Sequence, residues 1–142
     1  MQRDEALGRL RAARVGRLAT VTAEGRPHVV PFVFALVETA ERRIVYWAVD
    51  RKPKRTERIR RLDNIRANPL VELVVDGYDE LWSELWWVRA SGIARVVNDE
   101  AERRTALRAL AEKYEPYRAE PPSGPVVAID LRTITGWAAA SP

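Results

Sequence analysis

His28-Val29-Val30-Pro31-Phe32-Val33-Phe34-Ala35-Leu36 is the stretch that decides the fold. After His28, both alternating sets of side chains in it are apolar, so neither face of a strand built from it can be left in water. We expect one face to fill the inside of a small barrel and the other to be covered by a second subunit or a planar ligand. Pro31 has no backbone N–H, which predicts a sheet edge, a bulge or a close approach by another group.

Further strand-like runs lie on both sides of this stretch. They are rich in β-branched and aromatic residues and are separated by short polar turns. We expect strands at Gly16–Val21, Arg43–Val49, Leu70–Asp76, Leu85–Val97 and Val126–Leu131, with a last short run at Ile134–Trp137. Six or seven short strands, mostly in meander order, predict an α+β protein whose antiparallel sheet curls into a barrel.

Three segments have helical periodicity. We expect a short N-terminal helix at Asp4–Ala13 and a second helix that starts at Thr56 as N-cap and ends at Asn68-Pro69. A third runs from Asp99 to Tyr114, and Glu102, three positions after Asp99, completes a capping box. The last two are the main flanking helices. A proline-rich connection then returns the chain to its final strand.

Composition places the chain among ordinary globular proteins. With 142 residues we expect it to form a single domain, residues 1–142, with room for one core. It has no cysteine, which excludes disulfides, thiolate metal sites and cysteine nucleophiles, and its one histidine, His28, argues against a histidine-built metal site. No apolar leader or bilayer-length run is visible in the sequence. We therefore expect a cytoplasmic protein with neither a metal nor a membrane partner.

A short basic segment accounts for all of the net charge. Residues 50–66 contain eight cations and three anions, a local +5, whereas the whole chain sums to +4. Cations crowded before a helix start favour a phosphate or another polyanion. A solvated basic face is the alternative. A nucleic-acid-binding module is disfavoured, because the charge is concentrated in one segment and no basic stripe accompanies the aromatic strands.

Motifs for nucleophilic or metal catalysis are missing, so the five tryptophans and His28 are the remaining candidates. Trp86 and Trp87 are neighbours in a strand and must point to opposite faces, which leaves one indole for an interface or for stacking on a ring. Trp47 and Trp82 fit core or dimer packing. His28 is a structural hydrogen-bonder first and a catalytic proton donor only second.

Four blocks occur in a characteristic order. They are Gly16-Arg17-Leu18-Ala19-Thr20-Val21, Gly25-Arg26-Pro27-His28-Val29-Val30-Pro31, Lys52-Pro53-Lys54-Arg55-Thr56 and Asn64-Ile65-Arg66-Ala67-Asn68-Pro69. In this order and spacing the chain resembles the pyridoxamine 5′-phosphate oxidase-like, split β-barrel oxidoreductases that use flavins or deazaflavins. Tyr78-Asp79-Glu80, Leu85-Trp86-Trp87-Val88-Arg89-Ala90 and Gly136-Trp137 resemble one branch that depends on the deazaflavin coenzyme F420.

The resemblance implies a homodimer with an FMN-binding-like fold and two cofactor sites between the subunits. It places the ring along the strand His28 to Phe34 and the phosphate at the basic segment. The implied cofactor-binding residues are Val30, Pro31, Phe32, Lys52, Lys54, Arg55, Thr56, Arg58, Arg61 and, from the other subunit, Trp87. We expect His28, Trp86 and Trp137 to border the substrate pocket.

The function that follows is hydride transfer between coenzyme F420 and a small organic substrate. The eight cations favour the longer anion, since F420 adds a carboxylate-rich tail to its phosphate. The alternatives are an FMN-dependent enzyme on the same scaffold and a protein that binds the cofactor without catalysis. No catalytic residue is evident, because the ring itself carries the hydride in such enzymes.

Overall fold

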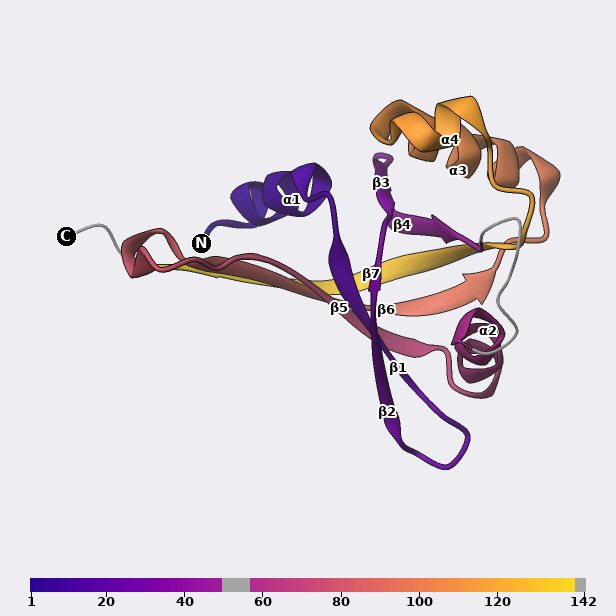
Figure 1. Cartoon of the computed structure of the whole chain (residues 1–142), viewed down its shortest axis with the longest axis horizontal. Helices are drawn as coiled ribbons and strands as arrows, with labels where there is room; N and C mark the ends of the chain where they lie inside the picture. The colour runs from indigo at the N-terminus through magenta and orange to yellow at the C-terminus, as the bar shows by residue number, and fades with distance from the viewer. Residues whose placement is uncertain (50–56, 140–142) are drawn as a thin grey trace.

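The computed structural model describes residues 1–49 and 57–139, and from residue 57 to 59 it describes the backbone only. Seven strands form one antiparallel sheet in the order β2-β1-β5-β6-β7-β4-β3. The strands are β1 Gly16–Val21, β2 Pro27–Phe32, β3 Ala35–Glu38, β4 Arg43–Ala48, β5 Leu70–Gly77, β6 Trp86–Val96 and β7 Val126–Ala138. The helices are α1 Arg3–Ala12, α2 Glu57–Ala67, α3 Glu100–Lys113, α4 Glu115–Ala119 and the short 3₁₀ helix η1 Trp82–Glu84 (Figure 1). The expected α+β split-barrel architecture is confirmed.

The barrel is split between two strands that follow each other in the chain. β2 and β3 lie at opposite edges of the sheet, although only Val33 and Phe34 separate them. The expected single strand from His28 to Leu36 is therefore wrong: it divides at this link, and each half pairs with a different neighbour. Pro31 lies in the edge strand β2, where the missing N–H costs no ladder bond.

Tyr114 provides the hydrogen bonds that a neighbouring strand would otherwise supply at the link. The Phe34 N–H donates to the Tyr114 hydroxyl oxygen at 3.1 Å, and that hydroxyl lies 2.9 Å from the carbonyl oxygens of both Phe34 and Arg14. Phe34 is fully buried, so without this hydroxyl its backbone groups would lack partners.

β4 is buried on both faces. Val45 and Trp47 point into the barrel core, whereas Ile44 and Tyr46 pack against α3. Trp47, at 1% exposed, belongs to the core as expected. Trp82 differs, because 76% of it is exposed and it lies outside the core.

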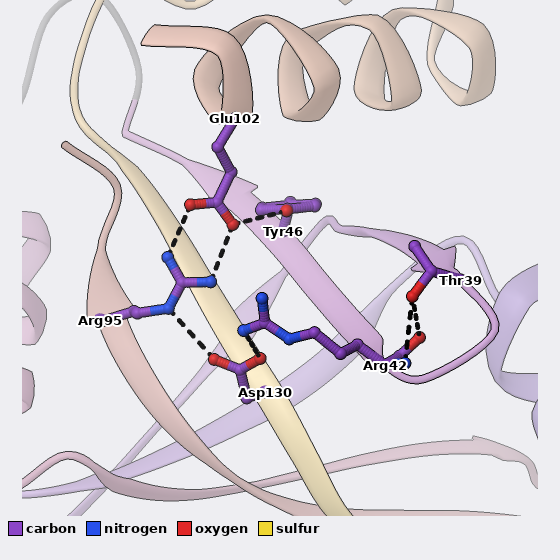
Figure 2. A network of polar contacts seen from close by, with 6 residues as sticks. All are labelled: Thr39, Arg42, Tyr46, Arg95, Glu102 and Asp130. Atoms are coloured by element: carbon purple, nitrogen blue, oxygen red, sulfur yellow. Dashed lines mark hydrogen bonds and ion pairs between the residues drawn. The ribbon is translucent and has the colours of Figure 1, made fainter. Parts of the chain in front are cut away.

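A polar network fixes α3 to the sheet (Figure 2). Asp99 caps the helix by accepting from the Glu102 N–H at 2.9 Å, but the Glu102 carboxylate turns to the sheet instead of completing a capping box. It accepts from both terminal nitrogens of Arg95 at 2.6 and 2.8 Å and from the Tyr46 hydroxyl at 2.8 Å. The hydrogen bonds from Arg95 lower the pKa of Glu102, and burial raises the pKa of Tyr46.

Two further elements differ from expectation. β7 is continuous where two runs were expected, and it pairs with β6 along its length through a register shift at Ser91 and Gly92. α4 forms within the proline-rich connection, with Pro116 in its first turn, a position where the missing N–H is harmless. In the described residues, no helix has both the length and the apolarity that a bilayer span requires.

Candidate functional site

A pocket of about 220 Å³ lies where β2, β4, α2 and α4 meet. Its wall consists of Val15, Pro31, Phe32, Val33, Trp47, Ala48, Arg61 and Tyr117. The pocket follows from the split, because the chain leaves β2 at Phe32 and turns away along Val33. Three of the sequence-derived cofactor residues meet here: Pro31, Phe32 and Arg61.

β2 contributes one outward and one inward side chain to this wall. Pro31 is exposed on the outer face, whereas Phe32 is 5% exposed and stacks on Phe34 with a ring-centroid distance of 5.0 Å. Gly16 makes this packing possible, since a Cβ there would come within 2.8 Å of Phe32 Cε1. Val30 is buried on the inner face opposite Leu18 and does not belong to the wall.

Arg61 and Trp47 form the charged side of the pocket. Arg61 lies on the inward face of α2 and is only 9% exposed, and its guanidinium carbon lies 4.6 Å from the Trp47 ring centroid. This is a cation–π contact in a buried setting, where such contacts are strongest. The Trp47 indole Nε1–H is buried and has no hydrogen-bond partner among the described residues.

Sequence reasoning did not identify Trp47 as a site residue. It lies near the end of β4, close in sequence to the basic segment, and that position is the signal that could have shown it. A buried N–H donor without a partner costs free energy.

The composition of the wall limits its chemistry. It holds aromatic and aliphatic side chains, one guanidinium and one tyrosine, and among the described residues no carboxylate or histidine lines it. Such a wall can bind and orient a planar ring that carries acceptor oxygens or negative charge. The residues of the wall therefore fit the ring of a flavin or a deazaflavin.

His28 lies on the inner face of β2, away from the pocket wall. It is opposite Thr20 in the β1–β2 register, and the Thr20 hydroxyl accepts from Asn64 of α2 at 3.1 Å. The His28 Nδ1 is buried and has no partner among the described residues. His28 thus lies outside the wall of this pocket, and its place at a substrate pocket stays a prediction.

The three tryptophans expected near the cofactor or substrate lie on two different faces of the sheet. Trp86 packs inward, where the Arg9 guanidinium carbon lies 4.8 Å from its ring centroid and Gly77 leaves room for the indole. Trp87 faces outward and is directly opposite Trp137 in the β6–β7 register, and Trp137 is 42% exposed. Trp87 and Trp137 therefore lie side by side, and Trp86 is on the other face. None of the three lines the pocket of its own chain.

The predictions for the basic segment concern residues that are mostly outside the described part. Lys52, Lys54, Arg55 and Thr56, the last of which is the expected N-cap, lie there. Arg58 falls in the first turn of α2, but its side chain is not among those described. Of the expected basic contacts, Arg61 is the one whose placement the structure gives.

In residues 1–49 and 57–139, no group of three or more histidine or acidic side chains could hold a metal ion.

The family model for pyridoxamine 5′-phosphate oxidase matches residues 3–138. No curated protein matches the chain in sequence.

Several solved structures share the fold. A conserved protein of unknown function from Corynebacterium diphtheriae is 27% identical, with a TM-score of 0.74 over 99% of this chain and 96% of that one. An FAD-binding protein from Mycobacterium smegmatis is 24% identical, with a TM-score of 0.70 over 100% and 98%. The heme storage protein of Vibrio cholerae is 17% identical, with a TM-score of 0.66 over 97% and 95%. The fold alone therefore does not fix the ligand.

Proposed function

Because the chain belongs to the pyridoxamine 5′-phosphate oxidase family, we propose that it is a homodimeric oxidoreductase that uses coenzyme F420. The cofactor would lie between the subunits and exchange a hydride with a small organic substrate. The observation that supports this best is the pocket at the barrel split, where Arg61 lies on Trp47 beside Phe32.

The pocket residues have separate tasks in this proposal. Phe32 and Trp47 provide apolar surface for a planar ring. Arg61 favours negative charge on the bound group, because a buried cation is poorly screened by water. When bound, the deazaflavin would supply the hydride chemistry. The protein's role is to bind and orient it.

The basic segment would hold the anionic part of the cofactor. Its eight cations exceed what the single phosphate of FMN needs, and the carboxylates of the F420 tail can pair with the rest. Lys52, Lys54, Arg55, Thr56 and Arg58 are the proposed contacts. Trp87 of the second subunit would reach the ring from its outward position on β6.

A flavin enzyme is the second candidate, and the resemblance to the M. smegmatis FAD-binding protein favours it. The two candidates differ in which cofactor binds. A protein that binds a cofactor without turnover would behave like either candidate in a titration and would differ only in the reaction.

Titration of the purified chain with F420, FMN and FAD, followed by cofactor fluorescence, tests the proposal. We expect F420 to bind at micromolar concentration and more tightly than either flavin. Arg61→Met and Trp47→Phe should each weaken binding about tenfold or more, whereas Arg104→Met, on the exposed face of α3, should change it less than twofold. If none of the three cofactors binds at micromolar concentration, the proposal fails.

The basic segment has its own test. Lys54→Ala with Arg55→Ala should weaken F420 binding far more than Arg104→Ala with Arg108→Ala, two exposed cations of α3. Equal effects would show that the segment is a solvated face. Oxidation of reduced F420 by an electron-poor C=C or C=N compound, followed by absorbance, then separates an enzyme from a carrier.

A further inference from the structure

β7 contains a β-bulge beyond the point where it stops pairing with β4. In the β6–β7 register Ser91 is opposite Thr133 and the next residue, Gly92, is opposite Leu131, so Arg132 is an extra residue outside the ladder. A bulge re-aims the side chain of its strand and is common beside functional sites. Arg132 is exposed, and its guanidinium has no hydrogen bond or ion pair with any other described residue.

The bulge borders a second pocket, of about 210 Å³, which we refer to as the arginine corner. It forms because β4 pairs with β7 only as far as Ile44 opposite Asp130, so that beyond this pair β7 has a neighbouring strand on one side only. The wall, as far as the structure describes it, consists of Glu41, Arg42, Arg43, Asp130, Leu131 and Arg132. Half of these residues are arginines and only Leu131 is apolar, so the corner suits a small polar anion.

The carboxylates at the corner are already shared between arginines. Asp130 accepts from Arg42 at 2.5 Å through Oδ1 and from Arg95 at 3.1 Å through Oδ2 (Figure 2). Glu38, next to the corner, pairs with Arg43 at 3.5 Å and with a second arginine from α1. Since each guanidinium has five N–H donors, two carboxylates cannot satisfy four of them.

The two remaining charges of the wall do not neutralise each other. Glu41 is exposed in the β3–β4 turn and forms no ion pair with Arg132 or with any other described arginine. The wall therefore has three guanidiniums and two carboxylates, a surplus of one positive charge. Guanidinium groups bind the oxygens of phosphate and carboxylate groups in pairs. A phosphomonoester fits three guanidiniums better than a carboxylate does, because it offers three oxygens and nearly two negative charges.

We propose that the arginine corner binds a phosphate group, free or carried by a small ester, with Arg132 as its main contact and Arg42 and Arg43 beside it. This site is separate from the pocket at the barrel split. Arg43 and Ala48 belong to different pockets and lie at the two ends of β4, roughly 16 Å apart at ~3.3 Å per residue. The inference rests neither on the cofactor nor on the dimer of the proposed function.

Isothermal titration calorimetry of the full chain with inorganic phosphate and with glycerol 3-phosphate tests the site. We expect a Kd of about 1 mM or below for at least one of them. Arg132→Met should raise the Kd about tenfold or more, and Arg132→Lys, which keeps the charge but not the planar fork, should raise it about threefold. Arg108→Met removes the same charge from the exposed face of α3 and should change the Kd less than about twofold.

Two further measurements locate the phosphate group and identify its source. Glu41→Gln should lower the Kd about threefold, because it removes a carboxylate that repels the ligand. In ¹⁵N NMR the Nε–H signal of Arg132 should shift on titration, and that of Arg108 should stay in place. A Kd for the ester at or below that for inorganic phosphate identifies an esterified ligand, and a higher one identifies the free ion. Either result supports the site.

The site would be overturned if neither compound binds up to about 10 mM, or if Arg132→Met and Arg108→Met weaken binding equally. Circular dichroism of each variant checks that the fold is kept. F420 binding should change less than about twofold in Arg132→Met, and a tenfold loss would show that the corner is part of the cofactor site. A chain that binds glycerol 3-phosphate through Arg132 but none of the three cofactors would overturn the proposed function alone.

Discussion

The pocket and the hairpin tip, residues 76–84 at the end of the β5–β6 hairpin, are both rich in aromatic residues. The aromatic side chains differ in how far they are exposed. At the pocket, Trp47 is 1% exposed and Arg61 covers its ring, whereas at the tip Trp82 is 76% exposed. The same residue type thus stabilises the fold at one end and is available for recognition at the other. Exposure rather than residue type determines the expected role, and matched substitutions at the two ends can test it.

Trp47→Ala and Trp82→Ala should differ most in their effect on stability. The first removes a buried indole from the core and should lower the free energy of unfolding by about 3–5 kcal/mol. The second removes exposed surface and should change the free energy of unfolding of the monomer by less than about 0.5 kcal/mol. Urea unfolding of both variants and of the wild type at one low protein concentration measures both changes. Similar losses in the two variants would show that the exposure of a tryptophan does not determine its contribution to stability.

Glu102→Gln should have the next largest effect, because it breaks the network that joins α3 to β4 and β6. The substitution removes the charged acceptor of two hydrogen bonds from Arg95 and one from Tyr46. We expect a loss of about 1.5–3 kcal/mol, and almost none for Glu84→Gln at the tip. The pKa of Glu102 is lowered in the folded state, so this stability is present above the unfolded-state pKa and is lost as pH falls through the folded-state pKa. The wild type should therefore lose its advantage over Glu102→Gln in acid.

Tyr114→Phe tests the link that splits the barrel. Without the hydroxyl, the buried Phe34 N–H and C=O lose their side-chain partner, and we expect a loss of about 1–2 kcal/mol. Tyr78→Phe is the matched change at the tip, where the hydroxyl is in solvent, and it should be neutral. Amide hydrogen exchange at Phe34 should rise in the first variant. If exchange there is unchanged, the hydroxyl does not hold the link.

The link also shows what sequence reasoning could and could not reach. Alternation and turn spacing located the segments that form the strands and the helices α1, α2 and α3, because these signals are local, but β2 and β3 were expected as one strand and β7 as two. The break at Val33 and Phe34 was missed, since Tyr114, which satisfies Phe34, lies 80 residues away in sequence. A continuous apolar run predicts a single strand unless that distant partner is known.

The candidate site was predictable only in part. Pro31, Phe32 and Arg61 came from the family's motif order, and the structure places them on one pocket. Trp47 was missed as a site residue, because a tryptophan in a core strand and a tryptophan that also lines a pocket have the same sequence pattern. For Trp82 the sequence left core and dimer packing open, and its exposure excludes the core.

Lys113→Met should give the smallest effect and the opposite sign. Lys113 Nζ is buried 4.1 Å from the Phe34 ring centroid and has no hydrogen-bond partner among the described residues. Burial lowers the pKa of Lys113 from 10.5 to about 8, and Arg14 adds to this. The folded state thus disfavours a charge that the unfolded chain carries freely, and methionine should raise stability at pH 7 by about 0.5 kcal/mol.

The pH dependence separates this cause from better packing. Between pH 8 and 10.5 the unfolded chain binds more protons at Lys113 than the folded one, so wild-type stability should rise with pH and the variant's gain should shrink. The rise should reverse near pH 10, because burial raises the pKa values of Tyr46 and Tyr114 and the unfolded chain then ionises first. Urea unfolding of both proteins from pH 7 to 9.5 measures the difference. A gain that stays constant over this range would assign it to packing, and Lys113 would then be no more than a long aliphatic side chain on Phe34.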